Sequence, residues 1–151
     1  MSEIRIVRDY PYPVATVWRA LTDPDLIPRW TATGAGAHPE GFAPTPGTRF
    51  RFVAQPRPGW SGIVNCEVLT AEEPNLLRYT WADEGSSDQT LVTYRLEPTD
   101  TGTRFTYEHT GFTGPGGWFM SRFLGRVRRR MLTEGLPPVL ASLTGDPQPR
   151  A

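Results

Sequence analysis

The first third of the chain alternates apolar and polar residues and then changes to helical spacing. Residues 3–10 have the period-two pattern that is typical of a strand. Pro13 suits a first helical turn, and the apolar residues after it recur every three or four positions: Val14, Val17, Trp18 and Leu21. Asp23-Pro24 predicts that this helix stops and that a second helix begins. The second, short helix has three apolar residues: Leu26, Ile27 and Trp30.

The middle of the chain predicts an antiparallel meander. Residues 33–47 are rich in Gly and Pro and show no period, so we expect a long loop there. Five alternating runs follow, separated by turn residues. Their inward positions would be Phe50 and Phe52, then Val64, Cys66 and Val68, then Leu77, Tyr79 and Trp81, then Val92, Tyr94 and Leu96, and finally Phe105, Tyr107 and His109.

The last segment predicts a long helix after a hinge-like loop at residues 111–117. One helical face would be apolar: Met120, Phe123, Leu124, Val127 and Met131. The arginines would form a solvated charged face: Arg122, Arg126, Arg128, Arg129 and Arg130. Gly135 and Pro137-Pro138 should break or kink the helix, which can resume for a turn or two. Residues 145–151 should be a frayed tail.

This element order predicts an α+β fold of the helix-grip type. A six-stranded, curved antiparallel sheet would wrap around the long C-terminal helix, with two short helices after the first strand. A single domain would span residues 1–144. A curved sheet closed by one helix seldom fills its own interior, so we expect a cavity lined by aromatic side chains.

Composition removes several classes of function. The 151 residues carry 16 Arg and no Lys against 16 Asp and Glu, so the net charge is zero and nothing favours nucleic acid as a partner. The absence of Lys excludes Schiff-base chemistry. One Cys and two His do not form a thiolate metal site, and we expect no metal and no cofactor. No apolar run reaches the length of a membrane span, so we expect a cytoplasmic protein, either a monomer or a homodimer.

Several stretches resemble the START-like proteins of the SRPBCC superfamily, and in particular those related to the C-terminal domain of the activator of the heat-shock protein 90 ATPase. The segment PYPVATVWRALTDPDLIPRW carries most of the resemblance. Later stretches agree with it: PGTRFRF at 46–52, LRYTW at 77–81, GTRF at 102–105 and HTGF at 109–112. The resemblance implies a Bet-v-1-like helix-grip fold. It also implies relatives that bind lipids or polyketides, or that act as aromatases and cyclases.

The preferred hypothesis is binding of a small hydrophobic or aromatic molecule between the sheet and the C-terminal helix. The loops at 33–47 and 111–117 would gate this cavity. The candidate ligand-binding residues are Phe52, Cys66, Tyr79, Trp81, Tyr94, Tyr107, His109, Met120, Phe123 and Val127. Polar-tipped aromatics offer stacking surface and a few hydroxyl groups, although large core residues have the same pattern. Cys66 would act as a small hydrophobe.

Two other functions remain open. In an enzyme of the cyclase, aromatase or hydrolase kind, His109 would be the best candidate for a catalytic base, because the pKa of histidine lies near neutrality. The same residue could simply be a hydrogen-bonded core histidine. In a co-chaperone-like interaction module, the Arg-rich final helix would contact a protein partner.

Overall fold

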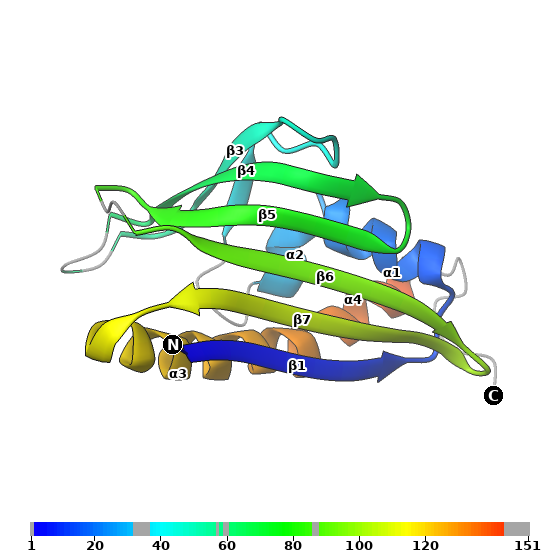
Figure 1. Cartoon of the computed structure of the whole chain (residues 1–151). Helices are drawn as coiled ribbons and strands as arrows, with labels where there is room; N and C mark the ends of the chain where they lie inside the picture. The colour runs from blue at the N-terminus through cyan, green and yellow to red at the C-terminus, as the bar shows by residue number, and fades with distance from the viewer. Residues whose placement is uncertain (1, 32–36, 57, 59–60, 86–87, 144–151) are drawn as a thin grey trace.

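One seven-stranded antiparallel sheet dominates the computed structural model, which describes residues 2–31, 37–56, 58, 61–85 and 88–143 (Figure 1). The strand order is β1-β7-β6-β5-β4-β3-β2. The strands are β1 (Ser2–Tyr10), β2 (His38–Glu40), β3 (Arg49–Val53), β4 (Ile63–Glu72), β5 (Leu76–Asp83), β6 (Thr90–Thr99) and β7 (Gly102–Phe112). The helices are α1 (Val14–Thr22), α2 (Ile27–Thr31), α3 (Gly114–Arg130) and α4 (Leu136–Leu143). The predicted α+β helix-grip arrangement is confirmed.

The strand count is a correction: the sheet has seven strands, where the sequence predicted six. The additional strand, β2, lies inside the predicted 33–47 loop and pairs with β3 at the edge of the sheet. Three residues are too few to show an alternation, and Pro39 within them argues against a strand except at an edge. Residues 32–36 of that loop and the predicted tail at 145–151 lie outside the described residues.

The predicted 111–117 loop is also wrong. β7 continues to Phe112 and α3 begins at Gly114, so only Thr113 separates the two elements. Pro115 occupies the first turn of α3, where its missing N–H would have no helical partner in any case. The glycines and the proline therefore start a helix here.

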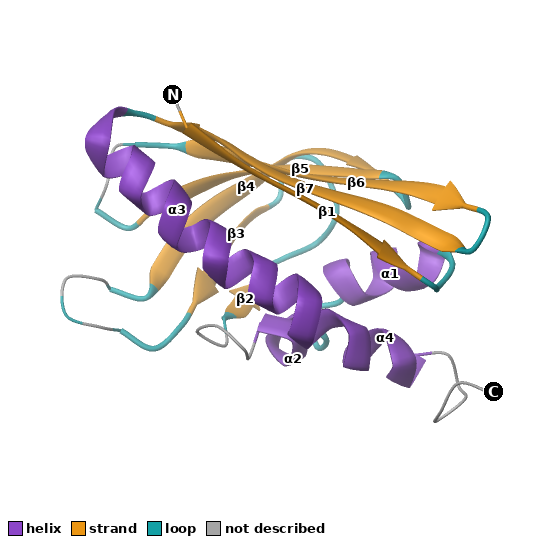
Figure 2. Ribbon diagram, turned by 90° about the horizontal axis from the view of Figure 1, so that it is seen from below, coloured by secondary structure: helices purple, strands orange, loops and turns teal. Residues whose placement is uncertain are grey.

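α3 lies across the concave face of the sheet, alongside β1 and β7 (Figure 2). Gly125 faces β1 where α3 approaches the sheet, and a Cβ at this position would meet Ile4 at an ordinary contact distance of 3.8 Å. The sheet curves around the helix, so its inward side chains and the inner side of α3 enclose one interior.

The helix continues past α3 through a π-helical turn, Met131–Gly135, into α4. The Leu136 N–H bonds the Met131 carbonyl, which leaves the Leu132 carbonyl without that donor; Pro137, the next residue, has no N–H. The Tyr10 hydroxyl donates to the Leu132 oxygen instead, at 2.7 Å, and is buried there. The prediction of a break near Gly135 is confirmed. Tyr10, the last residue of β1, supplies the hydrogen bond that the Leu132 carbonyl lacks within the helix.

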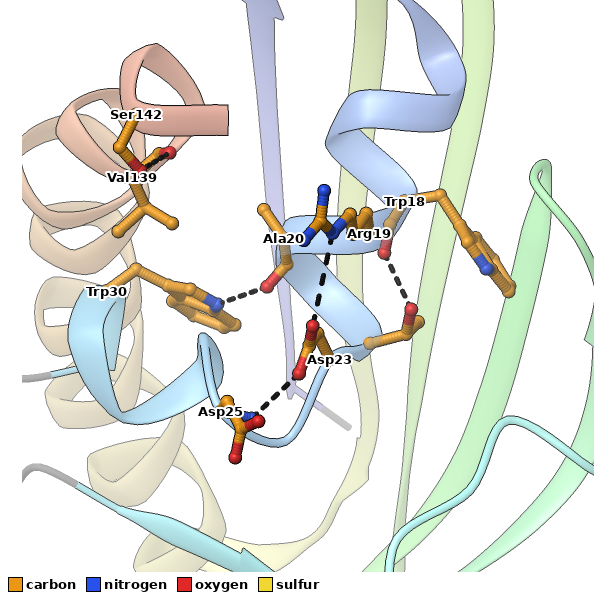
Figure 3. A network of polar contacts seen from close by, with 9 residues as sticks. Trp18, Arg19, Ala20, Asp23, Asp25, Trp30, Val139 and Ser142 are labelled. Carbon is orange, nitrogen blue, oxygen red and sulfur yellow. Dashed lines mark hydrogen bonds and ion pairs between the residues drawn. The ribbon is translucent and has the colours of Figure 1, made fainter. Parts of the chain in front are cut away.

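α1, α2 and α4 meet at one end of the sheet and close it (Figure 3). The Trp30 indole N–H of α2 donates to the Ala20 carbonyl of α1 at 2.9 Å. The helix stop at Asp23 is confirmed, because its carboxylate accepts from the Asp25 N–H at 2.9 Å. This end of the interior is thereby filled with buried side chains.

Candidate functional site

The inward positions of the meander carry the aromatic and polar side chains that the alternation predicted. Strand pairing sets Tyr94 opposite Tyr107 and Val92 opposite His109. Seven of the ten predicted ligand-binding residues share this inner face: Phe52, Cys66, Tyr79, Trp81, Tyr94, Tyr107 and His109. Five of these seven are buried: Cys66, Tyr79, Tyr94, Tyr107 and His109.

Three tyrosines form a cluster in the middle of the interior. The hydroxyls of Tyr79 and Tyr94 are 3.1 Å apart and share a hydrogen bond. The rings of Tyr94 and Tyr107 pack 5.9 Å apart between centroids. Burial raises the pKa of Tyr79 and Tyr107 and raises the pKa of Tyr94 to about 12, so all three hydroxyls are neutral at physiological pH.

His109 is fully buried and both of its ring nitrogens have hydroxyl partners. Nε2 lies 2.6 Å from Thr90 Oγ1, and Nδ1 lies 3.4 Å from the Tyr107 hydroxyl. Both ring nitrogens are therefore engaged, whichever of them carries the proton. Burial, assisted by the positive charge of Arg128, lowers the pKa of His109 to about 3. The imidazole is therefore neutral and oriented by its neighbours.

Arg128 sends its guanidinium into this interior, where the sequence predicted a solvated side chain. The guanidinium carbon lies 4.8 Å from the Trp81 ring centroid and 6.0 Å from that of Tyr107. Its Nη1 contacts the Met131 sulfur at 3.4 Å. The other arginines of α3, Arg122, Arg126, Arg129 and Arg130, are exposed as predicted.

A cationic group therefore lies among neutral hydroxyls and a neutral imidazole. Burial acts to lower the pKa of Arg128, but the oxygens of Tyr107, Tyr79 and Tyr94 outweigh it, and the pKa is raised. Burial also raises the pKa of the Cys66 thiol. The thiol stays protonated, as expected for a small core residue.

A cavity of about 190 Å³ opens where the start of α3 faces the ends of β5, β6 and β7. Its apolar walls come from both layers: Trp81, Phe112, Met120 and Leu124. Its polar lining includes Thr113 and the carboxylates of Asp83 and Asp88. Gly116 and Gly117 line the helical side, and Gly117 allows the helix to approach Phe112, because a Cβ at 117 would lie 3.0 Å from the Phe112 backbone. Thr90 also lines the cavity, so this space lies directly beside the His109 pair.

The three predicted ligand-binding residues of α3 lie in different surroundings. Met120 lies at the rim of the cavity and Val127 is half-buried against the core. Phe123 is 63 % exposed and does not line the cavity, because the first turns of α3 turn that side to solvent. Ligand contact by Met120 and Val127 stays a prediction. The exposed position of Phe123 argues against ligand contact by that residue.

Sequence reasoning missed Arg128, Leu124, Thr90 and Phe112 as site residues. A signal for Arg128 was available, since it follows Gly116, Met120 and Leu124 at intervals of four on one helical face. The predicted solvated helix face is therefore wrong for Arg128, whose guanidinium stacks on Trp81. Among the described residues, no group of three or more His, Cys, Asp or Glu side chains could hold a metal ion, and no described helix could cross a membrane.

Comparison with known proteins gave a family and a set of similar structures. Residues 11–127 match the family model described as Activator of Hsp90 ATPase homolog 1-like protein. The crystal structure of MLL2253 from Mesorhizobium loti is similar, with 30% identity and a TM-score of 0.79, over 94% of this chain and 98% of that one. CalU16 from Micromonospora echinospora has 29% identity and a TM-score of 0.67, over 97% and 77% of the two chains. The search of curated proteins found no match.

A third structure supports the fold alone. NE0264 from Nitrosomonas europaea has 22% identity and a TM-score of 0.73, over 93% of this chain and 94% of that one. The family match begins at Pro11 and ends at Val127, so it takes in the meander and most of α3. Arg128 is the first residue after it.

Proposed function

This chain belongs to the family of Activator of Hsp90 ATPase homolog 1-like proteins, and from that premise we propose that it binds a small hydrophobic or aromatic molecule between its sheet and its C-terminal helix. The START-like, Bet-v-1-like fold is known for binding hydrophobic ligands. The cavity of about 190 Å³ beneath the start of α3 is the observation that carries the proposal. The family match alone would leave the place of binding open.

The size and lining of the cavity define the kind of molecule. An apolar cavity of about 150 Å³ admits benzene, so this one suits one aromatic ring or two small fused rings. Trp81 and Phe112 present aromatic surface, and Met120 and Leu124 present flexible aliphatic surface. Much of the remaining interior is filled by the protein's own aromatic side chains, which argues against a ligand of lipid size.

The geometry supports binding better than catalysis by His109. A general base needs a free nitrogen and a pKa near the working pH. Both nitrogens of His109 are engaged, and its pKa is lowered to about 3. Thr90 instead lines the cavity, and His109 lies behind it at 2.6 Å and holds its hydroxyl in place.

A cavity-filling variant tests the proposal. A Cβ at Gly116 meets no atom within 4 Å, and Gly116 lines the cavity, so Gly116→Leu should occupy the space without a clash and favour the helix. We expect wild-type protein to bind 2-naphthamide, followed by tryptophan fluorescence and calorimetry, and Gly116→Leu to lose at least about tenfold in affinity.

The matched control is Phe123→Ala, which removes an exposed aromatic side chain of the same helix outside the cavity. It should leave naphthamide affinity unchanged. If Phe123→Ala abolishes binding while Gly116→Leu does not, the ligand lies on the outer side of α3 and the cavity proposal is wrong. No binding to the wild type would contradict it as well.

A second candidate function, contact with a protein partner, is favoured by the exposed aromatics of α3. Trp118, Phe119 and Phe123 are 47 %, 66 % and 63 % exposed, and Arg122 stacks on the Trp118 ring at 5.4 Å. The description of the matching family names activation of Hsp90 ATPase. Stimulation of purified Hsp90 ATPase that is lost in Phe119→Ser would support this function, and absence of stimulation by the wild type would contradict it.

A further inference from the structure

Arg128 lies at the inner end of the row of residues that lines the cavity. Gly116, Met120, Leu124 and Arg128 follow one another at intervals of four, so they share one face of α3. Gly116, Met120 and Leu124 line the cavity. Trp81 connects this lining to Arg128, because it lines the cavity and its ring also stacks against the guanidinium at 4.8 Å. A molecule that enters beside Met120 therefore approaches Arg128 across the Trp81 ring.

The charge of Arg128 has no anionic partner within the described part of the chain. The described ion pairs of the other arginines lie at the surface, for example Arg130 with Glu134 and Arg104 with Asp9. The neighbours of Arg128 are instead neutral hydroxyls, a thioether sulfur and aromatic rings. Its Nε is closed off from solvent and has no hydrogen-bond partner among the described residues.

A buried cation that has no anionic partner among the described residues is a costly feature for a fold. Burying an unpaired charge is strongly unfavourable, whereas an apolar side chain of similar length would pack at little cost. The C-terminal end of α3 has a negative dipole that partly offsets the charge, but it supplies no acceptor for Nε. The guanidinium therefore has unused capacity to donate hydrogen bonds next to a cavity.

We infer that Arg128 recognises an anionic group on the molecule bound in the cavity, and that this molecule is a small aromatic carboxylic acid. The planar fork of a guanidinium matches a carboxylate with two parallel hydrogen bonds. The ring of the acid would lie between Trp81 and Leu124, with its carboxylate directed along α3 toward Arg128. This inference rests on the proposed function and specifies its ligand.

The surroundings favour a carboxylate over a more highly charged anion. One guanidinium balances one negative charge. The negative end of the α3 dipole and the carboxylates of Asp83 and Asp88, which line the cavity, oppose a second. The cavity space of about 190 Å³ also suits a single aromatic body with one small acidic group. A phosphate ester would bring its extra charge without a second described cation facing this interior.

The test compares two ligands of the same shape, 2-naphthoate and 2-naphthamide, on the full chain by calorimetry. We expect wild-type protein to prefer the acid by about 10- to 100-fold, as for hydrogen bonds to a charged group. Arg128→Met should bind the amide as the wild type does and lose the preference for the acid. Arg126→Met, which removes an exposed arginine of the same helix, should keep the preference.

The outcomes separate this inference from the proposed function. Equal affinity of the wild type for acid and amide would overturn the role of Arg128 and leave the cavity proposal standing. Failure of the wild type to bind either ligand would overturn both. If Arg128→Met folds poorly, the comparison of the two ligands on wild-type protein still tests whether the acid is preferred. Arg128→Lys, which keeps the charge, should then retain part of the preference for the acid.

Discussion

The two halves of α3 both depart from the usual rule that aromatic side chains are buried and charged side chains are exposed. The first turns expose Trp118, Phe119 and Phe123 to solvent, while the last turn directs Arg128 into an aromatic interior. The difference follows from what lies opposite each half. The later turns face the closed interior and lead into the buried Met131 and Leu132, and the earlier turns lie over the open cavity.

The closed end of the interior has a structural role, and the open end holds the proposed binding site. At the closed end, α1, α2 and α4 complete the core with buried aliphatic and aromatic side chains. At the open end, apolar surface of α3 remains uncovered. The Arg128 guanidinium lies next to this region, between the open and closed ends, and has no anionic partner among the described residues. Apolar exposure and unpaired buried charge both oppose folding, so their positions on either side of the cavity support the binding role proposed above.

Truncation at each end should give the largest contrast in stability. Leu132→Ala removes a fully buried side chain at the closed end and should lower the free energy of unfolding by about 2–5 kcal/mol. Phe123→Ala should change it by less than about 0.5 kcal/mol, although the side chain is larger. Urea denaturation of both variants checks this. A large loss in Phe123→Ala would show that the first turns of α3 are packed in solution.

The burial of His109 should appear as a pH dependence of stability. The folded pKa is about 3 against an ordinary value of 6.5, so between these values the unfolded chain binds the extra proton. Stability should therefore fall as the pH falls below about 6.5, by about 1.5 kcal/mol on reaching about pH 5. Denaturation at several pH values measures it.

The control for this prediction removes the titrating group. His109→Asn should flatten the dependence above about pH 5, whatever its effect on absolute stability, and His38→Asn, in the exposed edge strand β2, should not. An unchanged slope in His109→Asn would mean that water enters through the cavity and reaches the imidazole. The boundary between the open and closed regions would then lie deeper than the structure places it.

The sequence predicted the sheet better than it predicted the helix. Alternation identified the inward side chains of five strands, including Tyr79, Tyr94 and His109, because a strand has only two faces. A helix has more than two sides, and apolar residues alone do not say which of them meets the sheet. Phe123 and Arg128 were therefore both placed on the wrong side.

The parts that escaped prediction depend on distant contacts. β2 is specified by its pairing with β3, and the cavity by the point at which α3 leaves the sheet. The environment of Arg128 depends on Trp81 and Tyr107, which come from two different strands. None of these is a property of a local window of sequence.

The smallest expected effect concerns the hydrogen bond that joins β1 to the π-helical turn at the closed end. Tyr10→Phe keeps the ring in the core but leaves the buried Leu132 carbonyl without the donor at 2.7 Å. The free energy of unfolding should fall by about 1 kcal/mol, the usual net contribution of one buried hydrogen bond. Tyr12→Phe is the matched control, because the structure shows Tyr12 hydrogen bonding through its main-chain atoms, and it should change stability less. Equal effects of the two variants would mean that the turn at Met131–Gly135 is held by packing alone, and the closed end would then owe its order to buried side chains without help from the β1 hydroxyl.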